Sequence, residues 1–342
     1  MHSFSSALIA WQREHGRHDL PWQCADAYRV WLSEVMLQQT QVVTVIPYFQ
    51  RFVTSYPTIA ALAAASEEQV LAHWSGLGYY ARGRNLHRAA KIVVALHGGE
   101  FPRRFEQILE LPGIGRSTAA AICALAYQQN RAILDGNVKR VLARYCGVAG
   151  SPAIKSVEAL LWELAESMLP KRGVDRYTQA LMDMGATLCT RSKPLCGSCP
   201  VQSDCVAFQT GRVAELPTPR ARRALPERRA TFLLAVSGGD ILLEKRGSSG
   251  IWGGLWCLPQ LEEGDEALEE YAQRLGWKID GQIELPLLTH TFTHFKLHIT
   301  PMLLSLAHKP AKVQRAEWMG MGDALSAAIP TPVRKLLEKI VG

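Results

Sequence analysis

The stretch Leu111-Pro112-Gly113-Ile114-Gly115-Arg116-Ser117 is typical of a tight hairpin between two helices. Pro112 fixes its own φ, and Gly113 and Gly115 permit backbone conformations that other residues resist. The helix that follows then begins with exposed backbone N–H groups, which suit an anion such as a DNA phosphate. We therefore expect a helix-hairpin-helix unit. Such units also occur in structural and non-catalytic DNA-binding proteins.

Asp135 lies twenty residues after Gly115 and opens a further predicted helix. A carboxylate near a phosphate-binding hairpin indicates chemistry on nucleic acid. An ordinary helix N-cap explains an aspartate at this position equally well. Asp135 alone therefore leaves catalysis and helix capping open.

Length and composition favour a globular protein with a polyanionic partner. The chain has 342 residues, enough for two domains with full cores, and is 48% hydrophobic and 20% charged. Its net charge of +7 and pI of about 9.0 favour a polyanionic partner without proving one. No run is apolar enough to span a bilayer and the amino terminus lacks a secretory pattern, so we expect no membrane partner and a cytoplasmic location.

The spacing of apolar residues and the content of proline and arginine divide the chain into three parts. Residues 1–210 show helical spacing of apolar side chains, and residues 230–342 predict an α+β domain. In the second part, strands are expected on both sides of Gly238-Gly239 and from Phe295 to Leu306, and a helix from Pro332 to Ile340. Residues 211–229 contain six arginines and two glutamates and are interpreted as a basic Pro/Arg linker, either solvated or in contact with DNA.

Four of the eight cysteines are crowded into residues 189–205 with the spacing C-x6-C-x2-C-x5-C, whereas the others are scattered. Four thiolates this close can bind one metal centre. Zinc commonly uses two separated C-x2-C knuckles, and this chain has one. We expect one [4Fe–4S] cluster, with zinc or no metal as alternatives. The four expected ligands are Cys189, Cys196, Cys199 and Cys205.

Glu34 is a second candidate carboxylate. On a helix it shares a face with Val30, Trp31, Leu37 and Gln38. Desolvation by apolar neighbours would raise its pKa and make it a proton donor near neutral pH. A boundary glutamate with its head in water is the alternative interpretation.

Together the two carboxylates suit cleavage of an N-glycosidic bond. That reaction needs a proton on the departing base and a negative charge near the cationic sugar, as in glycoside hydrolysis. Glu34 would be the acid. Asp135, kept ionised by N–H groups at its helix start, would face the oxocarbenium-like sugar.

These motifs resemble those of the MutY-type adenine DNA glycosylases, within the helix-hairpin-helix DNA glycosylase superfamily, over nearly the whole chain. The resemblance implies a multidomain fold: an all-α helix-hairpin-helix glycosylase domain with an iron–sulfur module, followed by a smaller α+β Nudix-like domain. The segments that carry it are Trp31 to Gln41, Gly76 to Arg82, Leu111 to Thr118, Ile133 to Arg140 and the four cysteines.

The resemblance implies base excision repair by base flipping, with removal of adenine mispaired with 8-oxoguanine or guanine. Glu34 matches the general acid and Asp135 the stabiliser of the transition state. Related bifunctional lyases carry a lysine nucleophile where this chain has Ser117, so we expect a monofunctional enzyme. We also expect a monomer acting on double-stranded DNA, with bacterial-type, nucleoid-associated activity in the cytoplasm.

Further residues match DNA-contact positions of the family. Ser117 would lie near the flipped base and Gly113 and Gly115 beside the backbone. Gln38 belongs to the same motif as the wedge residues. Positions that wedge into the duplex around the oxidised guanine correspond to Gln39, Thr40, Leu77 and Tyr79. Positions that line the adenine pocket correspond to Leu20, Trp22 and Gln179, although the segment from Trp22 to Glu34 is one residue shorter than the usual family spacing.

The carboxy-terminal part resembles a degenerate Nudix fold. Aligned on Gly276, Gln273 and Arg274 stand where the Nudix box needs two metal-binding glutamates, which argues against pyrophosphate hydrolysis. The residues Phe292, Thr293 and His294 match a family loop that reads 8-oxoguanine, with Thr293 where the family commonly has serine.

Three other functions compete with this interpretation: a glycosylase for thymine opposite guanine, a nucleotide hydrolase, and a non-catalytic iron–sulfur protein that senses redox state. The Nudix-like domain disfavours the first, Gln273 and Arg274 disfavour the second, and the third would not need both Glu34 and Asp135.

Overall fold

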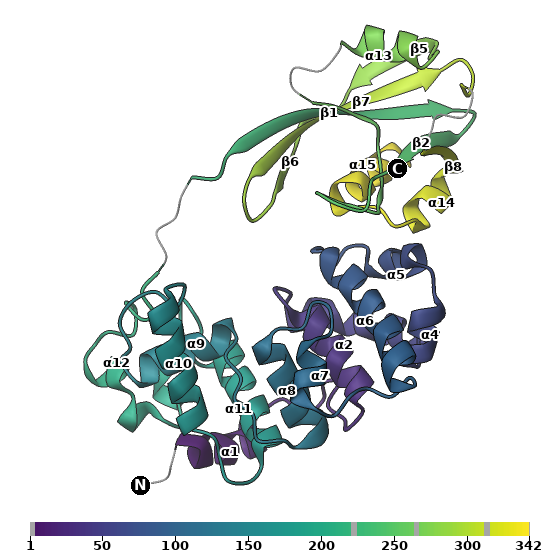
Figure 1. The fold of residues 1–342 in the computed structure, drawn as a ribbon. Coiled ribbons are helices and arrows are strands. Elements are labelled where there is room, and N and C mark those ends of the chain that lie inside the picture. The colour runs from purple at the N-terminus through teal and green to yellow at the C-terminus, as the bar shows by residue number, and fades with distance from the viewer. Residues whose placement is uncertain (1–3, 220–223, 263–266, 311–314, 342) are drawn as a thin grey trace. The chain divides into compact units, whose positions relative to one another are not determined.

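The computed structural model describes residues 4–219, 224–262, 267–310 and 315–341. It divides into two compact units: Met1–Ala64 with Asn85–Arg222, and Ala65–Arg84 with Arg223–Gly342. Figure 1 shows that the first unit is helical and that the second contains the sheet. In the described residues, no helix is both long and apolar enough to cross a membrane.

The first unit is built from helices, as the spacing of apolar residues predicts. They are α1 (Phe4–His15), α2 (Ala27–Leu37), α3 (Val42–Ser55), α4 (Ile59–Ala64), α6 (Ala81–His97, which begins in the second unit), α7 (Phe105–Leu109), α8 (Arg116–Tyr127), α9 (Gly136–Tyr145), α10 (Lys155–Ser167), α11 (Val174–Thr187), two 3-10 turns (Cys196–Ser198 and Gln202–Asp204) and α12 (Val206–Gln209).

Helices α8, α9 and α11 form the part of this unit that positions the site. Helix α11 packs against α1, α8 and α9, and α2 packs against α8. A continuous core includes Leu8, Val138, Leu142 and Leu181, all 2% exposed or less. Because the apolar faces of several helices meet here, the helix termini are held in fixed positions relative to one another.

The predicted hairpin lies between α7 and α8. Gly113 has φ +81°, and a Cβ there would lie 2.8 Å from the Cβ of Asn85, so glycine is required for both conformation and space. Gly115 differs from the expectation: its φ of −96° is open to any residue, and a Cβ would meet nothing within 4 Å. The fold itself therefore does not require glycine at position 115.

The second unit contains a mixed eight-stranded sheet in its described part, with the order β3-β2-β1-β7-β5; in addition, β4 pairs with β1, β6 with β7 and β8 with β2. Strands β1 and β7 are parallel and the other pairs are antiparallel. Its elements are α5 (Glu67–Trp74), β1 (Glu227–Ser237), β2 (Asp240–Lys245), β3 (Trp256–Cys257), β4 (Gln260–Glu262), α13 (Leu268–Arg274), β5 (Ile279–Glu284), β6 (Leu288–Thr291), β7 (Lys296–Leu306), β8 (Ala316–Gly320), α14 (Met321–Ser326) and α15 (Thr331–Val341).

The predicted α+β elements are confirmed. Ser237 pairs with Asp240 across the Gly238-Gly239 turn, and the expected strand and helix correspond to β7 and α15. Leu233, Leu242 and Leu304 are 2% exposed or less and pack with α13 in the sheet core. Along β7, Leu304 and Leu306 belong to this core, whereas Leu297, Ile299 and Pro301 are buried in the opposite phase of the strand.

Residues 65–84 belong to the second unit through specific contacts. Ser75 Oγ and Tyr80 Oη both donate to the Ile329 carbonyl, at 2.7 and 3.2 Å, and Arg84 Nη1 donates to the Gly253 carbonyl at 2.6 Å. Such pairings between residues far apart in sequence are not visible in any local pattern.

The predicted linker, residues 211–229, is described only in part, since residues 220–223 lie outside the described residues. Its final residues, 227–229, form the start of β1 rather than a loop. Lys296 N donates to the Pro226 carbonyl at 2.8 Å, which pairs the end of this segment with β7. The three-part division of the chain stays a prediction.

Candidate active site and cysteine centre

Helix α2 positions Glu34. Asp26 caps this helix by accepting a hydrogen bond from Tyr28 N at 2.9 Å, and Val30 and Trp31 on the Glu34 face are 2% exposed or less. Glu34 itself keeps some accessible surface. The residue is thus surrounded by packed protein on one side and accessible on another, as an acid that meets a substrate must be.

Helix α9 positions Asp135. Asp135 is the N-cap residue, and its Oδ1 accepts a hydrogen bond from Val138 N at 2.7 Å. The helix start that the sequence predicts at this residue is confirmed. Asp135 is therefore a helix cap in this structure, and any catalytic role is additional to that local one.

Burial and neighbouring charges shift the pKa values of both carboxyl groups. Burial, and secondarily the charge of Asp135, raise the pKa of Glu34 from an ordinary value of 4.5 to about 8. Burial also raises the pKa of Asp135, opposed by its helix N–H bonds and by the nearby charges of Arg140 and Lys139. The N–H bonds thus do not dominate at Asp135, contrary to the expectation, because desolvation outweighs them. Glu34 is the group poised to hold a proton at neutral pH.

Ser117 connects the hairpin helix to the Asp135 segment. Its Oγ accepts a hydrogen bond from Leu134 N at 2.9 Å, one residue before Asp135. A hydroxyl at the start of α8 therefore anchors the backbone that leads into α9. No local sequence pattern predicts this contact, since the two residues are seventeen positions apart.

A cavity of about 690 Å³ opens beside α2 and α11. Trp22, Val30, Ser33 and Gln179 contribute to its lining, so two of the three predicted pocket residues meet there. Trp22 packs edge-on against Phe49 with ring centroids 5.3 Å apart. Leu20 is 8% exposed and its N–H is bonded to Gln23 Oε1 at 3.1 Å. The volume is ample for a nucleobase.

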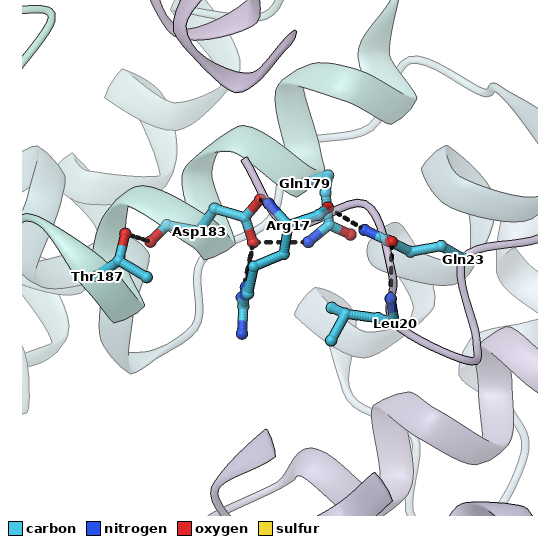
Figure 2. A network of polar contacts seen from close by, with 6 residues as sticks. All are labelled: Arg17, Leu20, Gln23, Gln179, Asp183 and Thr187. Carbon is cyan, nitrogen blue, oxygen red and sulfur yellow. Dashed lines mark hydrogen bonds and ion pairs between the residues drawn. The ribbon is translucent and has the colours of Figure 1, made fainter. Parts of the chain in front are cut away.

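A polar network lies behind Gln179 (Figure 2). Asp183 is fully buried, and its carboxylate accepts hydrogen bonds from Arg17 N at 3.0 Å, Arg17 Nε at 2.7 Å and Gln179 Nε2 at 2.9 Å. Arg17 Nη2 lies 2.7 Å from the same carboxylate as an ion pair. Gln23 Nε2 in turn donates to the Arg17 carbonyl at 2.7 Å.

Two wedge candidates follow α2 directly. Gln39 is exposed and has φ +58°, an uncommon conformation for a residue other than glycine. Thr40 N donates to the Leu37 carbonyl at 3.2 Å, which closes the turn. Gln38 is partly buried, and its amide lies 3.4 Å from Thr118 Oγ1 at the hairpin helix. The turn therefore presents Gln39 while Gln38 faces α8.

The loop before α6 contains the other two wedge candidates, of which Tyr79 is exposed and Leu77 is buried. Tyr79 is 44% exposed with φ +48°, and Arg82 Nη2 and Trp74 Nε1 both donate to the Gly78 carbonyl, at 3.2 Å each. Leu77 is only 5% exposed, so this conformation does not support the expected insertion of Leu77 into a duplex. Of these two residues, Tyr79 is the exposed one.

The tight turn between β6 and β7 carries the expected reader residues. Phe292 N donates to the Phe295 carbonyl at 2.8 Å, and the two rings stack with centroids 4.4 Å apart. Thr293 and His294 are exposed at the tip, with Thr293 Oγ1 3.4 Å from His294 Nδ1. The turn therefore displays a hydroxyl and an imidazole on a rigid aromatic base.

The four clustered cysteines line one cavity between α9, α11 and the 3-10 turns. In the described residues, no group of three or more His, Cys, Asp or Glu side chains is arranged to hold one metal ion. Buried Arg144 donates to the carbonyls of Thr190 and Arg191, at 2.7 and 3.1 Å, and its Nη1 lies 3.4 Å from Cys189 Sγ. Four cysteine thiols that line one cavity are the ligand set that an iron–sulfur cluster takes.

Sequence reasoning missed three residues of this unit: Arg17, Gln23 and Asp183. Asp183 follows Gln179 by four residues on α11, a spacing that places both on one helix face and that alone could have indicated the pair. Arg17 is 166 positions from Asp183, so no local pattern predicts their contact.

Comparison with known proteins defines the class first. Three family models match: "HhH-GPD superfamily base excision DNA repair protein" over residues 32–167, "Iron-sulfur binding domain of endonuclease III" over residues 189–205, and "NUDIX domain" over residues 230–339. A solved thermostable thymine-DNA glycosylase superposes on 60% of this chain and 95% of its own, with 28% identity and a TM-score of 0.55. The fold is that of helix-hairpin-helix DNA glycosylases.

Full-length relatives define the family within that class. The chain is 37% identical to the adenine DNA glycosylase of Buchnera aphidicola subsp. Acyrthosiphon pisum, over 98% of this chain and 97% of the relative. It is 36% identical to that of Mus musculus, over 98% of this chain and 77% of the relative. The chain belongs to the adenine DNA glycosylases, enzymes of base excision repair.

Proposed function

We propose that this enzyme hydrolyses the N-glycosidic bond of adenine paired with 8-oxoguanine or guanine, with Glu34 as general acid and Asp135 as the charge that stabilises the sugar cation. The observation that carries the proposal is the raised pKa of Glu34, about 8, beside a second carboxyl group. Two carboxyl groups with different protonation are the requirement for this chemistry.

In the proposed reaction, Glu34 donates its proton to a ring nitrogen of adenine as the C–N bond breaks. The bond's electron pair leaves with the neutral base. Asp135 faces the oxocarbenium-like sugar, and its position is fixed by Val138 N and by the Ser117–Leu134 contact. Water then adds to the sugar carbon, and the Glu34 carboxylate recovers a proton from it.

Ser117 supports a monofunctional enzyme. A lyase needs an amine that forms a Schiff base with the opened sugar, and a serine hydroxyl cannot do so. In addition, the Ser117 hydroxyl is already an acceptor for Leu134 N. We expect borohydride to trap no covalent complex with a reacting duplex.

We place the DNA backbone at the start of α8. The N-terminal N–H groups of this helix are available to a phosphate, and the space beside Gly115 is open. Gly115→Ala would fill that space without strain, so it should weaken duplex binding and leave thermal stability unchanged. Gly113→Ala, the matched comparison, should lower stability because of its φ of +81° and its contact with Asn85.

Gln39, Thr40 and Tyr79 are proposed to enter the duplex, and the turn from Phe292 to His294 is proposed to read 8-oxoguanine. The exposed, conformationally strained positions of Gln39 and Tyr79 support the first assignment. The exposed Thr293 and His294 support the second. Point substitutions test the reader better than removal of residues 230–342, because Ile329 is a hydrogen-bond partner of Ser75 and Tyr80.

The four cysteines are proposed to hold one [4Fe–4S] cluster. The cluster would tie the end of α11 to the 3-10 turns and so order the segment that leads to the basic residues after 211. Visible absorbance together with a measured ratio of four iron atoms per chain would support this stoichiometry. Zinc in place of iron would overturn it.

One experiment tests the function as a whole. Purified protein is incubated with duplexes containing A·8-oxoguanine, A·G, A·T or G·T, and alkali then reveals abasic sites. Adenine release from the two mispairs and none from A·T supports the proposal. Release from G·T would favour the thymine alternative, and no release from any duplex would contradict glycosylase activity. For the reader, Thr293→Val should slow A·8-oxoguanine more than A·G, with the exposed Thr54→Val as control.

A further inference from the structure

The amide of Gln179 has a fixed polarity. Its Nε2 donates to Asp183 Oδ1 at 2.9 Å, and Figure 2 shows the amide oxygen directed away from that carboxylate. A flipped amide would bring its oxygen against Asp183 Oδ1 at the same separation. Two acceptors facing each other are unfavourable, so the flip is disfavoured for as long as the carboxylate only accepts.

The Asp183 carboxylate is itself held in place. Arg17 contributes a charged guanidinium and a backbone N–H, and the Arg17 backbone is in turn held through Gln23. The Asp183 side chain is 1% exposed, so water does not compete for these hydrogen bonds. A buried ion pair of this kind keeps an acceptor in a fixed position next to Gln179.

Gln179 also lines the cavity of about 690 Å³ together with Trp22. Because Asp183 holds the amide nitrogen, the amide oxygen points to the other side, and it is the one acceptor that the Gln179 side chain can offer to a base in that cavity. An acceptor suits the exocyclic amino group of adenine. It repels the carbonyl oxygen that guanine or hypoxanthine carries at the same ring position.

We propose that Asp183 is a positioning residue for base selectivity: paired with Arg17, it holds the Gln179 amide oxygen toward the cavity and thereby favours a base with an amino group over one with a carbonyl. This inference rests on the proposed adenine-releasing function. Asp183 itself touches no substrate and acts through Gln179.

The test compares identical duplexes that carry adenine or hypoxanthine opposite 8-oxoguanine. The readout is the ratio of single-turnover rates, adenine over hypoxanthine, which a general loss of stability would not change. Substituting Asp183 alone leaves Arg17 without its partner, whereas replacing a buried ion pair by apolar residues is often neutral for folding. The main variant is therefore the double substitution Arg17→Met with Asp183→Leu, checked by circular dichroism.

We expect the double variant to lower the ratio by about tenfold or more, since the unheld amide can present either end. Gln179→Met, which removes the amide group from position 179, should give a ratio equally low or lower. Thr187→Val is the matched control: Thr187 Oγ1 donates to the backbone carbonyl of Asp183 at 2.8 Å and not to its carboxylate, so the ratio should stay at the wild-type value.

A folded double variant with the wild-type ratio would overturn the proposal. So would a wild-type ratio in Gln179→Met, which needs no change to the ion pair and therefore remains informative if the double variant does not fold. Wild-type protein that releases no adenine from any mispair would instead contradict the proposed function. The two failures are thus distinguishable.

Discussion

Two buried carboxylate sites in the first unit face opposite electrostatic surroundings. Glu34 has apolar neighbours and another carboxyl group, Asp135, and its pKa rises to about 8. Asp183 has a guanidinium, a backbone N–H and an amide N–H around it. The same functional group is therefore a proton donor in one place and a fixed acceptor in the other, and the neighbours rather than the residue type decide which.

The largest expected effect follows from removing the proton donor of this comparison, Glu34. Glu34→Gln keeps the shape of the side chain and removes the transferable proton, so adenine release should fall by about 10²- to 10⁴-fold. Binding of the mispaired duplex should persist. Single-turnover cleavage and fluorescence anisotropy measure the two quantities, and normal cleavage by the variant would refute the acid assignment.

A somewhat smaller loss is expected for Asp135→Asn. Asparagine also caps helices, so stability should change little, while loss of the charge should slow release by about 10²-fold. Because the Asp135 charge helps to raise the Glu34 pKa, the alkaline limb of the pH–rate profile should move to lower pH in this variant. A limb that stays in place would show that the two groups are not coupled.

Asp183→Asn should act on stability instead. The substitution leaves the Arg17 guanidinium, one quarter of whose side chain is exposed, without its countercharge. We expect unfolding to become easier by about 2 to 3 kcal/mol. Urea denaturation measures this change, with Asp175→Asn on the same helix as the matched comparison for the substitution itself. An unchanged midpoint would mean that the ion pair does not stabilise the fold.

Glu34→Gln should stabilise the fold relative to the wild type, in contrast to Asp183→Asn. In the wild type, the unfolded chain releases the Glu34 proton near pH 4.5, whereas the folded protein retains it up to about pH 8. Wild-type stability should therefore fall as pH rises through this window, by at most about 1.4 kcal/mol per pH unit from this group. The Glu34→Gln variant lacks this pH dependence. Its free energy of unfolding relative to the wild type should therefore grow with pH and level off above about pH 8. Thermal melts at pH 5, 7 and 9 test this, and a constant difference would contradict the raised pKa.

Much of the fold follows from local patterns. The left-handed conformation of Gly113 in the hairpin, the strand turn at Gly238-Gly239 and the helix start at Asp135 all match the structure, because each depends on residues within one or two turns of each other. The conformation of Gly115 does not match, whereas the expected role of Leu77 as a wedge stays a prediction, with its side chain buried here. The φ of Gly115 and the burial of Leu77 depend on packing that no short window of sequence contains.

The features of the candidate site also fall into two groups: those that local sequence identifies and those that depend on long-range contacts. The residue types at positions 34 and 135 and the four clustered cysteines could be selected from the sequence, since their chemistry and spacing are local properties. The Ser117–Leu134 bond could not, because it joins segments separated by a whole helix. The grouping of residues 65–84 with the carboxy-terminal residues is a further contact of this long-range kind.

By itself, the sequence determined the helical character of the first unit, the α+β character of the second, and the carboxyl and thiol groups available for chemistry. Only the tertiary structure decided what those groups experience. Burial raises the pKa of Glu34, and a guanidinium 166 positions away keeps Asp183 paired. Desolvation and charge act through space over a few ångströms, so they are set by which distant segments fold together and not by order along the chain.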